Sequence, residues 1–307
     1  MPINTEAIVW IACRFDQLVT PLMLWSLFAY VRFRTRGANK HLSVALFLFV
    51  AALFTKENAY ILPALVLFLE LAVMRPPRFR SALAFFGTAI LCAIYRFWVF
   101  GGIGGYRESS GASSVLHFHT TSLKGLLLRA PAEMLFGLNW VQPPPRITLL
   151  VAVSIAVVLL VIVAFPMRTR SSALSWAVVW VFLAPAPAHS MIRVGADLGN
   201  SRELYFASVG AALVVALLLS NVPQQPLRLV LCALLAILFG FGSWHNLNAW
   251  RYNGAMSRRL QMDVRGLFPD PLPGSVFVFI NLPRSERGIY FFSDRLGRGD
   301  PTGVREK

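Results

Sequence analysis

The sequence has few charged residues: Asp, Glu, Lys and Arg make up 14% of its 307 positions, against about 25% in soluble domains. Hydrophobic residues make up 56%, and apolar runs recur along the whole length. One soluble core does not hold so many runs, because long chains split into domains instead of enlarging a single core. The composition excludes a soluble globular domain and predicts an all-α, polytopic integral membrane protein.

Cysteine and histidine are also scarce. Cys13, Cys92 and Cys232 are far apart in the chain, so they form neither a metal-binding spacing nor a disulfide framework. His117 and His119 alternate with apolar residues in a segment typical of a loop strand, without further ligands nearby. We therefore expect no bound metal and no soluble cofactor.

Acidic residues are half as frequent as basic ones, with 14 Asp and Glu against 29 Lys and Arg. Such an excess could indicate nucleic-acid binding, but the basic residues fall in short clusters between apolar runs and near the C-terminus. That placement is typical of topology determinants and of contact with anionic lipid. We expect membrane lipids as partners and no nucleic acid.

The apolar runs predict about eight transmembrane helices, since a helical span needs about 20 apolar residues. The predicted spans lie near 15–33, 42–55, 59–74, 81–100, 147–166, 173–187, 204–221 and 229–245. The second and third are separated by the polar residues 55–58 and are expected to form a tight helical hairpin. Residues 1–245 are thus predicted to be a transmembrane helical bundle.

Basic residues follow every second predicted span, which predicts the orientation, because short cytoplasmic loops are rich in Lys and Arg. The N-terminus, the turn at Lys56 and the C-terminal tail then lie on the extracytoplasmic side. This parity requires that 122–142 does not cross the membrane, and its Lys124, Arg129, Pro131 and Glu133 favour an amphipathic surface helix. If that segment does cross, the tail is cytoplasmic.

The composition changes at about residue 246, and 246–307 is predicted to be a small extracytoplasmic α+β tail. A helix is expected first, followed by the breaker run PDPLPG. VFVFINL and IYFF then read as two strands of a β-hairpin joined by PRSERG. A unit of this size is too small to be stable alone, so we expect it to dock against the membrane part.

Ionisable residues at the ends of spans are candidates for function because burial near lipid is costly. Three pairs occur on the predicted extracytoplasmic side: Arg14 with Asp16, Lys56 with Glu57, and Arg202 with Glu203. Each pair alone has a structural explanation, as an interfacial anchor, a solvated turn or a helix start. Their coincidence on one side favours a shared site.

Several cations at headgroup depth suit a phosphate or pyrophosphate group, which Lys binds as a point charge and Arg as a fork. Arg14, Lys56 and Arg202 are the predicted phosphate-binding residues. Asp16, Glu57 and Glu203 are expected to orient these cations or to accept hydrogen bonds from a hydroxylated substrate.

The same residues carry a family resemblance. PINTEAIVWIACRFDQ resembles the HP-x-x-x-EA-V…R-x-D segment of GT-C glycosyltransferases that use polyprenyl-phosphate sugars. FTKENAYILPALVLFLEL resembles their KE-x-x-x-x-x-P hairpin, and NSRELYFASVG resembles their ER-Y-x-Y-x-P-S-x-G segment with looser spacing. The match runs in order along most of the chain and is most similar to protein O-mannosyltransferases and the transmembrane tetratricopeptide-repeat mannosyltransferases.

The resemblance implies a partial GT-C bundle that transfers a sugar from a lipid-linked phosphate donor to an extracytoplasmic protein or glycan, in the bacterial inner membrane. Arg14 and Lys56 would hold the donor phosphate, with Arg202 in the same cavity. The family's catalytic acidic residue lies in a loop before the region where this chain begins, so we expect an N-terminally truncated member without that residue. Two alternatives are a catalytically inactive relative that binds lipid-linked sugar or a partner, and a polytopic transporter or flippase. Transporters often show internal repeats, and none is visible here.

Overall fold

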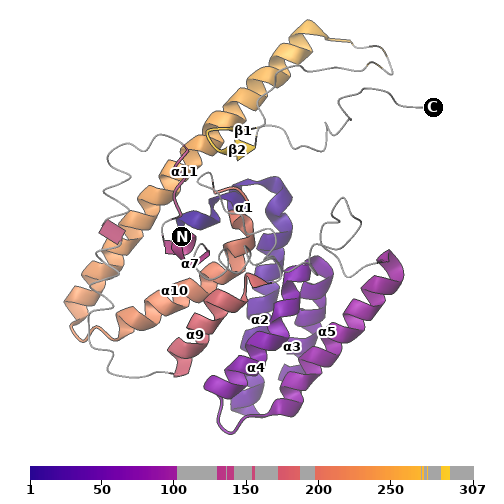
Figure 1. Ribbon diagram of the computed structural model, residues 1–307, viewed down its shortest axis with the longest axis vertical. Coiled ribbons are helices and arrows are strands. Elements are labelled where there is room, and N and C mark those ends of the chain that lie inside the picture. The colour runs from indigo at the N-terminus through magenta and orange to yellow at the C-terminus, as the bar shows by residue number, and fades with distance from the viewer. Residues whose placement is uncertain are drawn as a thin grey trace, which may run out of the picture.

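The computed structural model describes residues 1–101, 130–135, 137–141, 154–155, 172–186, 198–270, 272, 275 and 285–290. These residues are mostly helical (Figure 1). The chain begins with the short helices η1 (Pro2–Asn4), α1 (Thr5–Val9) and η2 (Ile11–Cys13). The His117 and His119 segment lies outside the described residues.

Four helices pack side by side in the first half of the chain: α2 (Arg14–Arg36), α3 (Asn39–Thr55), α4 (Leu62–Ala72) and α5 (Phe79–Phe100). The 3-10 turn η3 (Glu57–Ile61) connects α3 to α4. Gly37, with a φ of 72°, ends α2 in the left-handed conformation that a tight reversal needs. The Ser26 hydroxyl then donates to the Ala45 carbonyl across the α2–α3 interface, at 2.7 Å.

The second half of the described chain contains α7 (Ala130–Leu135), α9 (Ser172–Leu183), η6 (Ser201–Leu204), α10 (Tyr205–Ser220) and α11 (Gln225–Leu267). In the α9–α10 pair, the indole N–H of Trp180 donates to the Phe206 carbonyl at 3.2 Å. A Cβ on Gly210 would lie 2.9 Å from Trp180, so this pair packs closely because Gly210 has no side chain.

Among the described residues, three helices are long and apolar enough to cross a membrane: Phe79–Val99, Ser201–Ser220 and Gln225–Leu267. A fourth candidate is the bent pair Pro2–Val9 with Arg14–Arg36, whose two parts differ in direction by 115°. Large apolar side chains such as Leu91 and Trp98 are exposed on α5, as expected for contact with lipid and not with water.

The other predicted spans are not confirmed as crossings. Asn39–Thr55 and Ser172–Leu183 are apolar helices of fewer than 18 residues. The predicted span 147–166 lies outside the described residues, apart from 154–155. The described chain therefore supports three to four crossings by length and composition, which fits a membrane protein.

The helix α11 is continuous over 43 residues and passes through position 245, where the last span was expected to end. At 1.5 Å per residue it is about 65 Å long, whereas the hydrocarbon core of a bilayer is about 30 Å thick. One end of α11 must therefore project beyond the bilayer or lie along its surface if the helix crosses.

The β-hairpin of the tail is formed by other residues than the sequence predicted. Strand β1 (Ser285–Glu286) pairs antiparallel with β2 (Ile289–Tyr290). Arg287 and Gly288 both have positive φ, as a two-residue hairpin turn requires. Thus β1 lies inside PRSERG, the segment expected to be the linker, and VFVFINL lies outside the described residues.

The segment 122–142 is not the predicted surface helix over its described part. Only Ala130–Leu135 is helical there, and Leu138 and Asn139 are each 1% exposed. The Asn246 side chain on α11 donates to the Gly137 carbonyl at 2.8 Å and accepts the Asn139 backbone N–H at 2.9 Å. The segment is buried by its apolar residues and by the hydrogen bonds of its backbone, and it lies between the N-terminus and α11. Residues 122–129 lie outside the described chain.

A buried ion pair joins α2, α4 and α5 at the end of the bundle that carries the basic loops. Arg34 Nε lies 2.7 Å from Glu70 Oε1, and that oxygen also accepts the Tyr30 hydroxyl at 2.7 Å. The second Glu70 oxygen accepts the Arg78 backbone N–H. Arg34, one of the basic residues that follow the first predicted span, is thus a buried partner of Glu70.

Candidate functional site

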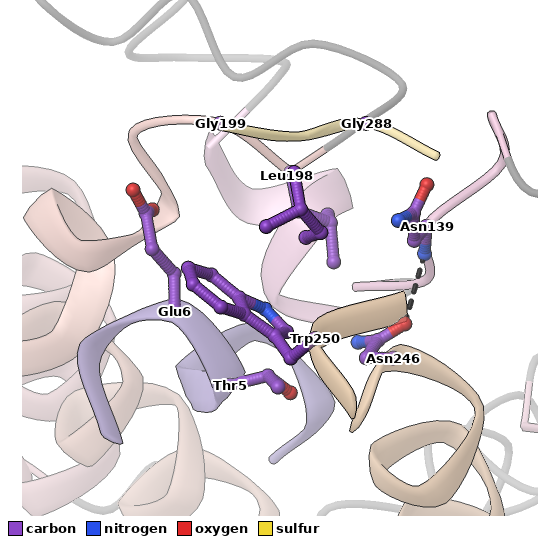
Figure 2. A pocket seen from close by; sticks show the side chains of 9 residues that line it. Thr5, Glu6, Asn139, Leu198, Gly199, Asn246, Trp250 and Gly288 are labelled. Carbon is purple, nitrogen blue, oxygen red and sulfur yellow. Dashed lines mark hydrogen bonds between the residues drawn. The ribbon is translucent and has the colours of Figure 1, made fainter. Parts of the chain in front are cut away.

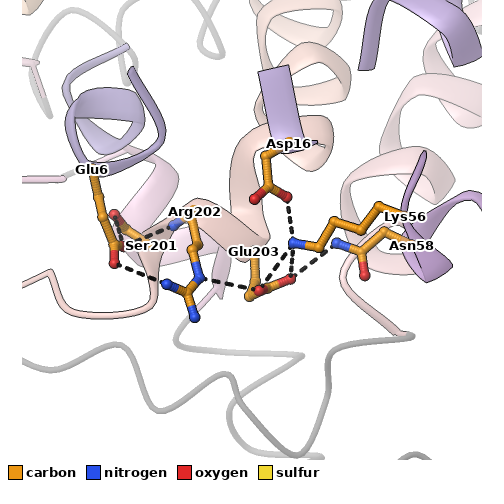
Figure 3. A network of polar contacts seen from close by, with 7 residues as sticks. All are labelled: Glu6, Asp16, Lys56, Asn58, Ser201, Arg202 and Glu203. Carbon is orange, nitrogen blue, oxygen red and sulfur yellow. Dashed lines mark hydrogen bonds and ion pairs between the residues drawn. The ribbon is translucent and has the colours of Figure 1, made fainter. Parts of the chain in front are cut away.

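Lys56 lies at the centre of a charge network at the opposite end of the same helices (Figure 3). Its backbone is extended, with a φ of −156°, where α3 ends and η3 begins. The ammonium lies 2.5 Å from Asp16 Oδ1 on α2, and 3.2 Å and 3.3 Å from the two carboxylate oxygens of Glu203 on η6. One side chain therefore connects three segments that are far apart in the sequence.

Glu203 receives two further donors. The Asn58 amide donates to Glu203 Oε2 at 2.9 Å, and Arg202 Nε donates to Glu203 Oε1 at 3.4 Å. Both oxygens of this buried carboxylate are therefore satisfied by cations or amides, which is the condition under which a carboxylate remains charged in a protein interior.

Glu6 on α1 extends the network to the N-terminus. Its Oε2 accepts the Ser201 hydroxyl at 3.1 Å and the Arg202 backbone N–H at 3.0 Å. Arg202 Nη1 lies 4.0 Å from Glu6 Oε1, and the guanidinium lies over the Trp10 ring at 4.8 Å from its centroid. Arg202 is thus held by Glu6 and Glu203 on either side (Figure 3).

The carboxylates are more deeply buried than the cations. The side chains of Glu6, Glu203 and Asp16 are 4%, 5% and 7% exposed, whereas those of Arg202 and Lys56 are 13% and 15% exposed. Burial disfavours the charged ammonium, but Glu203 and Asp16 outweigh this effect and raise the pKa of Lys56 above its ordinary value. Lys56 is therefore charged throughout the neutral range.

The three carboxylates and two cations give this network a formal charge of −1. Two other cations lie near it. Arg14 is exposed on the first turn of α2, two residues before Asp16. Arg96 on α5 donates from Nη1 to the Leu53 carbonyl at 3.4 Å, three residues before Lys56. With them, and with Glu57 on η3 also counted, four cations and four carboxylates lie at this end of the bundle.

Four of the six residues proposed from the sequence are in contact: Asp16, Lys56, Arg202 and Glu203. Arg14 and Glu57 are not in the network. Arg14 points outward because it lies on the lipid- or water-facing side of α2, while Asp16, two residues later, faces inward. Glu57 is half-buried on η3, without an ion pair to any described cation.

Sequence reasoning missed three members of the network: Glu6, Asn58 and Ser201. Each lies within one of the three motif segments already identified, close to a predicted residue. Glu6 is part of the EA pair of the opening motif, and that position was the available signal. Whether a polar residue turns inward depends on helix rotation, which spacing alone did not determine here.

A small pocket adjoins the network at Glu6 (Figure 2). Thr5 and Glu6 line it from α1, Asn246 and Trp250 line it from α11, and Leu198 lines it from the turn before η6. Its enclosed space is on the order of one water molecule. The pocket therefore connects the network to α11 but is too narrow to hold a sugar ring in this conformation.

Comparisons of the chain with models of protein families, with curated proteins and with solved structures give no match. The function of the chain is therefore inferred from the site itself and from the motif segments that form it.

Proposed function

We propose that this chain is a membrane glycosyltransferase of the GT-C type that binds a lipid-linked sugar phosphate at the Lys56 network. The observation that carries the proposal is the set of contacts from Lys56 to Asp16 and Glu203. These residues belong to the three separate motif segments on which the resemblance rests. Residues up to 187 positions apart in sequence thus act on one another at one end of the bundle.

The geometry suits a phosphate at the rim of the network. Lys56 and Arg202 are its more exposed members, and the deeper carboxylates hold both side chains in place, so little ordering is required on binding. Arg14 and Arg96 add positive charge at the same end. Hydrogen bonds from Arg or Lys to phosphate are charge-assisted and stronger than neutral ones.

In the proposed reaction, the bond between C1 of the sugar and the donor phosphate oxygen breaks, and a bond forms between C1 and an acceptor hydroxyl oxygen. The hydroxyl proton passes to a base, and the lipid phosphate leaves with its negative charge. Lys56 and Arg202 would stabilise that charge as it develops. The proposal assigns the base to none of the described residues.

The orientation belongs to the same proposal. The Lys56 network and the Arg34–Glu70 pair lie at opposite ends of α2–α5, and the basic loops lie with Arg34. If that end is cytoplasmic, the network and the N-terminus face the extracytoplasmic side of a bacterial inner membrane. The eight-span arrangement and the extracytoplasmic tail are part of this proposal.

The test uses the full chain in nanodiscs of neutral phosphatidylcholine, with a short-chain polyprenyl monophosphate as the probe and the matching polyprenol as its uncharged counterpart. We expect the phosphate to bind at least tenfold more tightly than the alcohol. Arg202→Gln should weaken binding of the phosphate by about tenfold, as loss of one charged hydrogen bond implies. Arg14→Ala, which removes a nearby exposed charge outside the network, should also weaken binding, but by less.

Arg258→Ala is the matched control, because Arg258 is exposed on α11 away from the network, and it should leave binding unchanged. Arg14 is exposed, so its variant tests binding without disturbing the fold. Equal affinity for the phosphate and the alcohol, or unchanged affinity in both site variants, would overturn the proposal.

A further inference from the structure

A second cavity lies at the basic end of the bundle, where the α2–α3 hairpin meets the start of α5. It measures about 520 Å³, which is within the range of about 300–1,000 Å³ found for ligand sites. Phe33, Leu42, Phe79 and Ala84 form its apolar walls, and Arg78 and Arg80 lie along it. The Lys56 network lies at the other end of α2 and α3, so the two sites are distinct.

The cavity combines an apolar wall with uncompensated positive charge. Within the part of the chain that the structure describes, no carboxylate lies within 4.0 Å of the side-chain nitrogens of Arg78 or Arg80. The acid next to this cavity is Glu70, and it is already paired with Arg34. An anionic group at Arg78 and Arg80 would therefore meet two positive charges without a competing carboxylate.

The position of Arg78 is fixed by the fold. Its backbone N–H donates to Glu70 Oε2, and its guanidinium lies 5.8 Å from the centroid of the Phe33 ring, which is itself a wall of the cavity. The cation is thus held beside the apolar surface. Arg36 and Lys40 lie on either side of the nearby α2–α3 turn, and both are exposed. This end of the bundle is therefore rich in positive charge.

We propose that this cavity binds an anionic phospholipid of the surrounding membrane, with the phosphate at Arg78 and Arg80 and one acyl chain along Phe33, Leu42, Phe79 and Ala84. The charge of the rim selects the headgroup, and the apolar wall holds the chain. The proposal does not depend on glycosyl transfer, because it uses none of the residues of the Lys56 network.

The test measures lipid retention by native mass spectrometry on the full chain, extracted from vesicles of equal phosphatidylglycerol and phosphatidylcholine. We expect wild-type protein to retain phosphatidylglycerol at least fivefold over phosphatidylcholine. Arg78→Gln combined with Arg80→Gln should abolish this preference, and the backbone hydrogen bond from position 78 to Glu70 remains. Arg251→Gln combined with Arg258→Gln is the matched control and should retain it.

A second variant tests the acyl groove. Ala84→Phe fills the cavity and should reduce retained phosphatidylglycerol to the level of phosphatidylcholine, whereas Leu83→Phe, at a neighbouring position 63% exposed outside it, should not. The proposal is overturned if Ala84→Phe retains phosphatidylglycerol as wild type does, or if the wild type shows no headgroup preference. Displacement of the lipid by millimolar inorganic phosphate would also overturn it, since headgroup charge alone would then explain binding.

Discussion

Lys56→Met is expected to lower the free energy of unfolding by about 3–5 kcal/mol, because it leaves buried charges without their partner. Methionine has nearly the length of lysine but no charge, so Asp16 and Glu203 would lose the ammonium that lies between them. Water cannot easily replace it, since both carboxylates are at most 7% exposed. Chemical unfolding of the purified chain in detergent micelles measures the change.

Lys40→Met is the control for that substitution. Lys40 lies in the first turn of α3, the helix that Lys56 directly follows, and is exposed. Its loss should therefore change the stability by no more than about 0.5 kcal/mol. Equal effects of the two substitutions would show that Lys56 is only a solvated turn residue, as the sequence alone also allowed.

Glu70→Gln is the second substitution with a large expected effect, again about 3–5 kcal/mol of stability. Glutamine keeps the shape of the side chain and still accepts the Tyr30 hydroxyl, but it leaves the buried Arg34 guanidinium without a counter-charge. The same unfolding assay applies, and Arg34→Met should be about as destabilising.

Glu57→Gln is the control substitution for Glu70→Gln in the unfolding assay, because Glu57 is half-buried and forms no ion pair with a described residue.

The combined variant Arg34→Met with Glu70→Met should recover much of the lost stability, since removing both charges removes the desolvation cost along with the attraction. A combined variant as unstable as the sum of the single variants would contradict this account of the pair.

The two ion-pair networks have different structural roles. Arg34 and Glu70 join helices that are close in the chain, at the end with the basic loops. The Lys56 network joins the first half of the chain to the segment before α10, because Glu203 lies on η6 and Glu6 on α1. A ligand at Lys56 would therefore contact both halves, and its binding should stabilise their association.

The helices α2 and α5 were well predicted because one end of each carries a local signal. The expected spans 15–33 and 81–100 correspond to α2 and α5 within a few residues. Gly37 ends α2, and prolines precede α5, so the sequence marks these boundaries directly. Apolar composition and breakers are properties of a short stretch of chain, and they require no knowledge of tertiary packing.

A helix was expected after residue 245 as well as before it, but the continuity of α11 through that position was missed, because composition and helix continuity are different properties. Residues after 245 become polar, which suggested a new unit, but no proline occurs between there and Pro269, and Gly254 and Gly266 do not interrupt the helix. The polar half of α11 remains helical and buries Asn246, Ala249 and Asn253 against other segments. Asn253, for example, donates to the Glu286 carbonyl of the hairpin at 2.9 Å. Such long-range contacts leave no trace in local composition.

The site was predictable as a set of costly charges but not as a set of pairs. Lys56 and Arg202 could be identified because charge beside an apolar run requires a reason. Their pairing with Asp16 and Glu203, the addition of Glu6 and the outward position of Arg14 depend on how each helix is rotated. Rotation follows from packing of the whole bundle, so only the structure determines it.

The proposed site depends on the contact between Lys56 and Glu203. A double-mutant cycle tests most directly whether these two residues interact. The cycle compares the stability of the wild type, Lys56→Met, Glu203→Gln and the combined variant in the same unfolding assay. Residues in one ion-pair network typically couple by about 0.5–3 kcal/mol. We predict that the combined variant is more stable than the sum of the single effects by at least about 1 kcal/mol. Single effects that add to within about 0.3–0.5 kcal/mol, as for distant residues, would contradict the network and the site built on it.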